Sequence, residues 1–339
     1  MTEPGGERIL LGHGSGGRLY RDLVNDVFVT AFANPVLDRL DDAAVLASPG
    51  RIAVTTDSHV VRPLRFPGGD IGRLSVAGTV NDLATAAARP LALAAAFVIE
   101  EGLPLDELRA LCASMASTAE EAGVDVVTGD TKVVERGACD GVFITTTGVG
   151  EVVVQHDLGA GSVRDGDAVL LSGEIGAHAV AVLAARGEFH FRTPVESDSA
   201  PLWRLVEAAV AAAGPGLRFL RDPTRGGLTT VLAELAEESG LGLEIEEEAI
   251  PVAPGVHAVC ELLGLDPLTL ANEGKMVLVT APEAADAVLD ALRGAPYGAG
   301  AVRIGSVTAA HGGRVALRTR LGTRRVLDMP VGELLPRIC

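Results

Sequence analysis

The sequence predicts a mixed α/β protein of two domains, and three observations support this. The chain has 339 residues, a length that favours two domains. Hydrophobic residues make up 48% of it and aromatic residues only 3%, so aliphatic side chains are plentiful enough for two cores. Stretches with helical spacing and stretches with strand-like composition alternate along the chain, as they do in mixed α/β layers.

The first half of the chain contains two helical patterns among strand-like stretches. The second helix begins after Pro104, and Gly123 stands where a left-handed C-cap is expected. The strand-like stretch 43–56 is broken by a turn signal at Ser48-Pro49-Gly50. In order, we expect two short strands within 43–56, a helix at 71–88, a strand at 90–99, a helix at 105–122, and strands at 124–134 and 142–153.

A second series of strands and helices follows a turn-rich stretch at 159–167. The expected helices lie near 177–185, 200–213, 227–239 and 282–292, and the expected strands near 169–171, 243, 277, 302–307 and 315–317. We therefore divide the chain into a glycine-rich N-terminal segment (1–35), a first domain (36–155), a second α/β domain (156–326) and a mobile tail (327–339).

The formal net charge of −17 argues against nucleic acid and anionic membrane as partners, because both are bound through clustered Lys and Arg. An anionic ligand would need metal ions or glycine amides. Residues 1–8 hold no apolar signal core, and the longest uncharged apolar run, 91–99, is too short to span a bilayer. We expect a cytoplasmic protein.

Aspartates recur at four places beside elements that we expect to be buried. Asp42 precedes a strand, Asp57 ends one, Asp82 lies in the first helix, and Asp130 ends another strand or turns out of it. Carboxylates that converge on magnesium ions bound to a polyphosphate would satisfy one another, whereas a buried, unpaired carboxylate is costly. Each could instead be a helix cap or a solvated loop residue. Spacing alone does not choose between these interpretations.

A glycine-rich run covers residues 11–17 and contains Gly14, Ser15 and Gly16. Glycines let backbone N–H groups converge on an anion. The run lacks the Gly-Lys-Ser/Thr of a Walker A loop, and it does not follow a strand as a dinucleotide fingerprint would. A phosphate lid and a flexible leader both remain open.

The last residue, Cys339, ends a proline-spaced segment that starts at Met329. Such a segment advances about 3.1 Å per residue, so its eleven residues could carry a thiol over roughly 30 Å. A frayed terminus is the alternative. Cys112 and Cys260 lie in apolar helical patterns and are expected in the core. With no Cys-x-x-Cys present, we expect neither a zinc site nor a disulfide framework.

Together these stretches resemble known proteins. Four of them resemble the nucleotide site of the aminoimidazole-ribonucleotide synthetase superfamily, which includes selenophosphate synthetase and thiamine-monophosphate kinase: 42–44, 55–57, 81–83 and 129–132. Longer stretches are similar to the HypE family of hydrogenase maturation proteins: 13–17, 66–72, 129–134, 221–228, 272–275 and the ending 336–339.

The resemblance implies an α/β (α+β) fold of two PurM-like domains, in which the N-terminal sheets of a homodimer pair into a barrel with ATP at its rim. Domain 36–155 would then bind ATP and form the dimer. The residues implied at the nucleotide are Gly14, Ser15, Gly16, Asp42, Asp57, Thr79, Asn81, Asp82, Gly129 and Asp130, the four aspartates through Mg²⁺.

The implied activity is ATP-dependent dehydration of an S-carbamoyl group on Cys339 to a thiocyanate, which supplies the cyanide ligand of nickel–iron hydrogenase. The carbamoyltransferase HypF would load the carbamoyl group, and the HypC–HypD complex would receive the cyano group. An amide oxygen is a poor leaving group, and phosphorylation by ATP would convert it to phosphate. Lys132 would lie near the transferred phosphoryl group. Glu273 is the candidate base, with His13 as the alternative, although a loop carboxylate or helix cap also explains Glu273.

Two other classes of function remain. A kinase or synthetase of the superfamily could act on a free small molecule, in which case removal of Cys339 would leave turnover intact. The second alternative is an interaction module that responds to ATP and catalyses no reaction. Release of ADP that depends on a carbamoylated tail would exclude this alternative.

Overall fold

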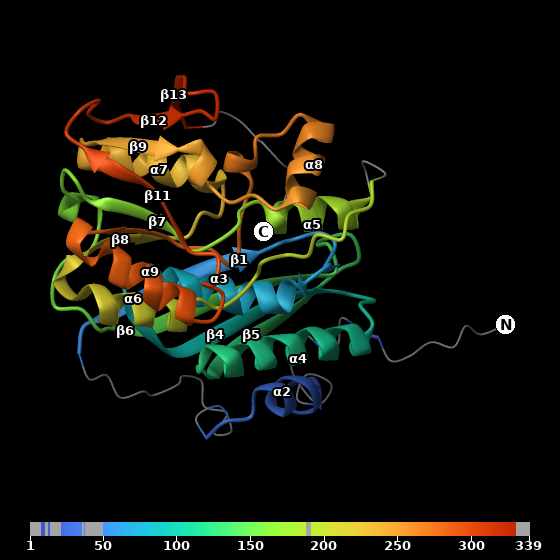
Figure 1. The fold of residues 1–339 in the computed structure, drawn as a ribbon. Helices are drawn as coiled ribbons and strands as arrows, with labels where there is room; N and C mark the ends of the chain where they lie inside the picture. The colour runs from blue at the N-terminus through green and yellow to red at the C-terminus, as the bar shows by residue number, and fades with distance from the viewer. Residues whose placement is uncertain are drawn as a thin grey trace.

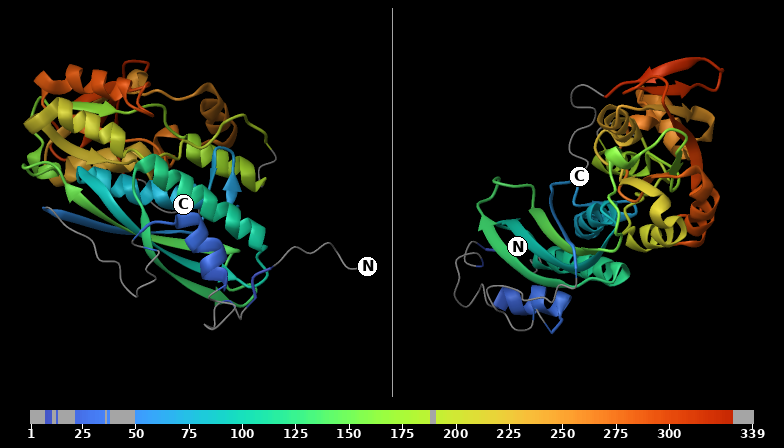
Figure 2. Two further views of the ribbon diagram at one scale, coloured as in Figure 1. Left: turned by 90° about the horizontal axis from the view of Figure 1, so that it is seen from below. Right: turned by 90° about the vertical axis from the view of Figure 1, so that its left-hand side faces the viewer.

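The computed structural model describes residues 8–10, 13, 22–35, 37, 50–187 and 191–329. Gly14, Ser15, Gly16, Asp42 and Cys339 lie outside the described residues, as does the strand expected before Ser48. The described chain forms a four-stranded and a seven-stranded sheet stacked one above the other, and a small two-stranded sheet besides. Helix α3 (Ile71–Thr85) lies between the lower sheet and the upper domain (Figures 1 and 2).

The first domain is built on a four-stranded sheet of order β1-β6-β4-β5. β4 and β5 are parallel and joined by α4, whereas β6 runs antiparallel to both of its neighbours. Before the sheet, a π-helical turn runs into α2 under α4 (Figure 1). The elements are Val24–Val29 and α2 (Thr30–Phe32), β1 (Ile52–His59), β2 (Arg65–Phe66), β3 (Gly69–Asp70), α3 (Ile71–Thr85), β4 (Ala88–Glu100), α4 (Leu105–Ala122), β5 (Val126–Val134) and β6 (Val142–Val152).

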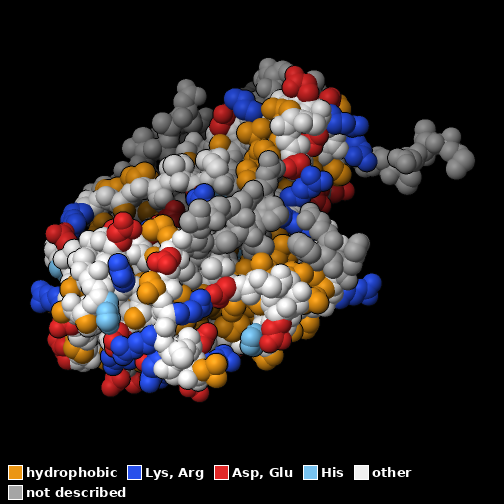
Figure 3. Space-filling view, turned by 90° about the horizontal axis from the view of Figure 1, so that it is seen from above, with side chains coloured by type: hydrophobic (Ala, Val, Ile, Leu, Met, Phe, Trp, Pro, Cys, Tyr) orange, Lys and Arg blue, Asp and Glu red, His pale blue; other side chains and the backbone are white. Residues whose placement is uncertain are grey.

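The second domain carries a seven-stranded sheet of order β13-β12-β9-β11-β7-β10-β8. In Figure 3, which views the molecule from above, Lys and Arg mix with Asp and Glu over the surface, and ion pairs of this domain include Arg318–Glu246 and Arg324–Glu244. The elements are β7 (Ala168–Leu171), α5 (Ala177–Arg186), α6 (Trp203–Ala213), β8 (Leu217–Arg221), α7 (Gly227–Ser239), β9 (Gly242–Glu246), α8 (Pro254–Leu263), β10 (Val277–Thr280), α9 (Ala285–Gly294), β11 (Val302–Thr308), β12 (Val315–Arg318) and β13 (Arg324–Leu327).

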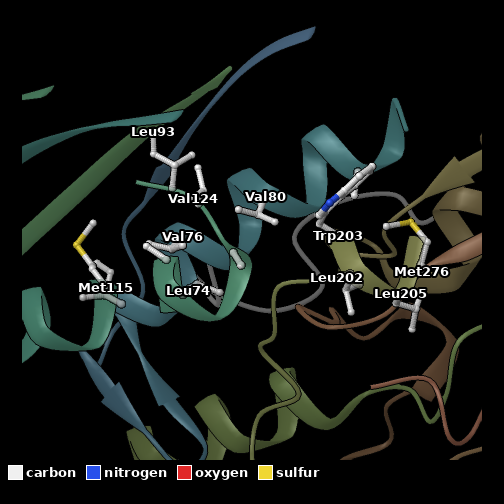
Figure 4. Packing of buried hydrophobic residues seen from close by; sticks show 14 of the residues in the cluster. Leu74, Val76, Val80, Leu93, Met115, Val124, Leu202, Trp203, Leu205 and Met276 are labelled. Atoms are coloured by element: carbon white, nitrogen blue, oxygen red, sulfur yellow. The ribbon is translucent and has the colours of Figure 1, made fainter. Parts of the chain in front are cut away.

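Helix α3 is the element that joins the two domains. Figure 4 shows Val76 and Leu74 of α3 near Met115 of α4, with Leu202 and Trp203 of the second domain on the other side. Most α3 side chains are therefore buried on every side, although the helix includes polar residues. Any polar group on α3 must find its partner in one of the two domains.

The expected strands and helices are largely confirmed, and Gly123 ends α4 with φ +72° as a left-handed C-cap. Cys112 and Cys260 are buried, as expected. β8, α8 and β13 were not expected. Across the described ranges, no helix is long and apolar enough to cross a membrane.

The expected positions of two site residues within their strands were wrong. Asp57 lies inside β1, which continues to His59, because Ser58 and His59 still pair with β6. Asp130 likewise lies inside β5, because β4 keeps pairing with β5 as far as Val134. The end of β1 was placed too early because the partner strand, and not local composition, sets where a strand ends. The end of β5 at Val134 agrees with the strand expected at 124–134, so only the position of Asp130 within it was wrong.

Candidate active site

A cluster of carboxylates lies where α3 meets both domains. Asp57 comes from β1 and Asp82 from α3, and the second domain supplies Asp222 just after β8 and Glu273 before β10. These groups are close together, because the charge of Asp57 raises the pKa of the other three and the charge of Asp82 raises those of Asp222 and Glu273. The cluster therefore draws on four separate segments of the chain.

Asp57 and Asp82 are brought together by the packing of α3 against β1. Residues of β1 alternate between the two faces of the sheet, so Thr55, Asp57 and His59 all point toward α3. Thr55 Oγ1 donates a hydrogen bond to Asp82 Oδ2 at 2.9 Å. Gly78 lets α3 approach the side chains of β1, since a Cβ there would lie 3.0 Å from His59 Cε1 and 3.6 Å from Asp57 Oδ2.

Burial raises the pKa of Asp82, and the neighbouring charge of Asp57 adds to this effect, although the hydrogen bond from Thr55 opposes it. A divalent cation between these carboxylates would relieve their repulsion, and oxygen donors of this kind are those that Mg²⁺ prefers. The donor set of Asp57 and Asp82 therefore fits a magnesium ion. The described residues alone contain no group of three or more possible ligands arranged around one point.

Asp222 was not assigned a role from the sequence, although the stretch 221–228 that contains it was noted. Burial and the charge of Asp82 raise the pKa of Asp222 to about 7. The positive charge of Arg221 opposes the rise in the pKa of Asp222. Arg221 and Arg225 together oppose the rise in the pKa of Asp82. The stretch 221–228 was one of those that resemble the family, and this was the feature of the sequence that could have indicated Asp222. No neighbouring residue showed that Asp222 would face residues of the first domain.

Glu273 is 4% exposed. Burial raises the pKa of Glu273 well above its usual value, and nearby carboxylates raise it further: Asp222, Asp198, Asp57 and Asp82. A buried carboxylate among other carboxylates binds a proton tightly, which is the property of a strong base. The structure thus brings Glu273 to the same cluster as Asp57 and Asp82.

Asn81 and Thr79 are buried in α3, and their polar atoms contact other parts of the chain. The Asn81 amide donates to the carbonyl oxygens of Ala200 at 3.0 Å and Glu273 at 3.3 Å, and its oxygen accepts from Leu202 N at 2.8 Å. Thr79 Oγ1 lies 2.6 Å from Thr146 Oγ1 of β6. In this arrangement Asn81 ties the first domain to the backbone of Glu273.

Asp130 and Lys132 lie on the opposite face of the sheet from α3. Asp130 is in register with Ala96, Thr145 and Ser58, a row that points away from the helices, whereas Asp57 points toward them. Three strand spacings of about 4.8 Å separate β5 from β1, so Asp130 is roughly 14 Å or more from Asp57. Within one chain, therefore, Asp130 does not join Asp57 and Asp82.

Asp130 and Lys132 instead contact each other. Lys132 Nζ donates to Asp130 Oδ1 at 3.1 Å, and this hydrogen bond holds the pKa of Asp130 below its usual value. Gly129 belongs to β5 and is in register with Ala95 of β4, and a Cβ on it would come within 2.4 Å of Ala95 O. This glycine is required by close strand packing.

His13 is the remaining described candidate. Leu10 N donates to His13 Nδ1 at 3.0 Å, and nearby Ile9 N donates to Leu103 O, just before α4. Its hydrogen bonds within the described ranges are thus with its own segment and not with the carboxylate cluster.

A cavity of about 660 Å³ opens beside the cluster. Asp82 and Asp222 lie in its wall, with Arg221 and Arg225 next to them. The segment after β6 and the side of α7 complete the wall, so the cavity lies between the domains. A molecule in this space would meet Asp82 and Asp222 of the cluster together with the two arginines, whereas Asp57 and Glu273 are not part of the wall.

Two models of the AIR synthase related proteins match the chain, one for the N-terminal domain over residues 40–152 and one for the C-terminal domain over residues 164–318. The carbamoyl dehydratase HypE of Rhodobacter capsulatus is 53% identical over 337 residues, which cover 98% of both chains. A crystal structure of hydrogenase maturation protein HypE in complex with ATP superposes with a TM-score of 0.93 at 49% identity, over 97% of this chain and 99% of that one. A HypE chain from a HypE–HypF complex superposes at 0.80 with 46% identity, over 91% and 99%.

Proposed function

The chain belongs to the AIR synthase related family, among its HypE carbamoyl dehydratases, and on that premise we propose that it converts an S-carbamoyl group on Cys339 to a thiocyanate with ATP. The observation that carries the proposal is the meeting of Asp57 and Asp82 from one domain with Glu273 from the other. Carbamoyl dehydration needs a phosphoryl transfer and a proton abstraction in one place, and this cluster has carboxylates suited to each.

Asp57 and Asp82 are the residues that would hold Mg²⁺, which when bound neutralises the triphosphate of ATP. A protein of net charge −17 needs such help to attract a polyanion. Arg221 and Arg225 in the cavity wall orient the phosphates or the carbamoyl oxygen, because their N–H groups donate in fixed directions.

Glu273 removes protons from the carbamoyl nitrogen. In the chain alone, burial and surrounding carboxylates keep a proton on Glu273. Once cationic charge compensates Asp57 and Asp82, part of that repulsion disappears, and the pKa of Glu273 falls toward the working pH. Glu273 therefore becomes able to act as a base once cationic charge is bound at Asp57 and Asp82.

The cavity between the domains is where we place the reacting group. Its volume of about 660 Å³ is ample for the end of a peptide chain, and Asp82 and Asp222 lie in its wall. Glu273 lies behind this wall, and Asp222 is the neighbouring carboxylate that most raises the pKa of Glu273. In our proposal Cys339 brings its carbamoyl group into this cavity and leaves it again as a thiocyanate.

A homodimer completes the site. Asp130 and Lys132 lie on the open face of the sheet, away from their own Asp57, so they act on the nucleotide of a partner subunit. The same face ends at the edge strand β1, where Val54 is 67% exposed, and a long edge strand with apolar side chains favours pairing with another chain. The two sheets would then close into a barrel with a nucleotide site at each rim.

HypF is the partner that loads Cys339, and the HypC–HypD complex is the acceptor of the cyano group for nickel–iron hydrogenase. A related HypE chain has been crystallised with HypF, which supports the first of these assignments. The setting we propose is the cytoplasm.

The test follows the mass of Cys339 after incubation with carbamoyl phosphate, ATP and HypF. The intact protein should gain a carbamoyl group and then lose the mass of one water molecule. Glu273→Gln should accumulate at the carbamoyl stage, because glutamine keeps the shape of the side chain and cannot take a proton. Normal dehydration by this variant would exclude Glu273 as the base. Turnover of a free small molecule after deletion of Cys339 would instead support a kinase or synthetase.

A further inference from the structure

An extended segment, residues 196–202, crosses between the two domains and passes directly beside Glu273. Ser197 N donates to Pro67 O at 2.8 Å, and Arg73 of α3 donates to Ser199 O at 2.7 Å. Gly274 allows the backbone of this segment to approach, since a Cβ at Gly274 would lie 1.7 Å from Asp198 O. The segment is therefore packed backbone to backbone against the loop that carries the proposed base.

Asp198 is the acidic side chain of this segment that reaches Glu273. Its Oδ1 accepts a hydrogen bond from Glu273 N at 3.3 Å, and its Oδ2 lies 3.1 Å from Lys275 Nζ. The side chains of Asp198 and Lys275 are only 7% and 12% exposed. Lys275 also donates to Gly274 O at 3.0 Å. The ion pair therefore contacts the backbone N–H of Glu273 through Asp198 and the carbonyl of Gly274 through Lys275.

The carbonyl of Glu273 is held as well. Glu273 O accepts from Ala200 N at 3.2 Å and from the Asn81 amide at 3.3 Å. The main chain of Glu273 thus has partners on its N–H and on its C=O, all from buried groups. These hydrogen bonds fix the main chain of Glu273 and do not involve its carboxylate, which faces the cluster.

Lys275 also neutralises the buried carboxylate of Asp198. Asp198 adds to the negative charge around Glu273, Asp222 and Asp57, and an unpaired buried carboxylate there would be costly. Lys275 is one of only two lysines in the chain, and the other, Lys132, lies on the far face of the sheet. A lysine beside an ATP site is commonly expected to contact phosphate, but this ammonium group is already committed to Asp198 and Gly274.

We propose that the buried Asp198–Lys275 ion pair is a positioning element that holds Glu273 in place for proton abstraction, and that Lys275 acts through Asp198 and not on the phosphoryl group. The inference rests on the proposed role of Glu273 as the base. It assigns Asp198 and Lys275 as positioning residues.

The test compares Lys275→Met, Asp198→Asn and the double variant, all loaded with a carbamoyl group on Cys339. Each single substitution leaves one buried charge unpaired, so we expect conversion to the thiocyanate to slow by on the order of 100-fold. The double variant removes both charges, and the amide oxygen that Asp198→Asn introduces can still accept from Glu273 N. Its rate should therefore recover to within about tenfold of that of the intact protein. The KM for ATP should stay within about twofold throughout.

Two results would overturn the inference. If the double variant is as slow as Lys275→Met, the lysine acts directly on the reaction. If all three variants lose ATP binding and melt at a much lower temperature, the pair only supports the fold. Arg109→Met, which breaks the exposed Asp106–Arg109 pair on α4, is the matched control and should be unchanged.

Glu273→Gln in the same assay separates this inference from the proposed function. Normal conversion by Glu273→Gln would refute the base, and with it the positioning role. A slow Glu273→Gln beside normal single variants at 198 and 275 would refute the positioning role alone.

Discussion

A heterodimer of one Asp82→Ala subunit and one Asp130→Ala subunit should have dehydratase activity that neither variant homodimer has. Asp82 faces the carboxylate cluster of its own chain, whereas Asp130 lies on the other face of the sheet, roughly 14 Å or more from Asp57. If a site combines Asp82 of one subunit with Asp130 of its partner, a heterodimer of the two variants has one intact site and one doubly damaged site. Each variant alone should lose turnover by about 100-fold or more.

The assay uses the two variants with different affinity tags, so that heterodimers can be isolated. Isolated heterodimers should show about half of wild-type dehydration, and an unfractionated equal mixture about a quarter, because half of its dimers are mixed. A heterodimer of Asp57→Ala with Asp82→Ala is the matched control. Both of these residues belong to the same subunit's site, so it should stay inactive. An Asp82→Ala/Asp130→Ala heterodimer as inactive as this control would refute the shared site.

Three further outcomes are expected. Cys339→Ala should bind ATP normally but accept no carbamoyl group, and mass spectrometry after incubation with HypF would check this; loading at another cysteine would contradict it. Asp222 has a pKa raised to about 7, so in metal-free protein its proton stabilises the fold below about pH 4 and this contribution is lost as pH rises toward 7. Asp222→Asn cannot ionise and avoids that loss. In urea titrations the free energy of unfolding of Asp222→Asn minus that of the wild type should therefore increase by about 2–3 kcal/mol between about pH 5 and about pH 8. A difference that does not change with pH would exclude the raised pKa. Gly274→Ala places a methyl group 1.7 Å from Asp198 O, so it should lower the free energy of unfolding by about 1–3 kcal/mol and slow dehydration, and an unchanged melting temperature would argue against the close packing.

Local features of the chain were readable from the sequence because they depend on neighbours a few residues away. Helix α4 follows from its apolar spacing, and its end follows from Gly123, whose φ of +72° a side chain would disfavour. Asn81 and Asp82 were correctly placed in a helix for the same reason. The order of short motifs also sufficed to indicate the family, since motif order is a property of the chain.

Only the tertiary structure decided which of these residues meet. Asp222 and Glu273 lie far along the chain from Asp82, and α3 brings them together because it is buried between two domains. Asp130 resembled Asp57 in sequence context, yet the twofold alternation of a strand and the pairing of β5 with β4 put it on the opposite face. Pairing register and domain packing are set by contacts between distant segments, so no local pattern contains them.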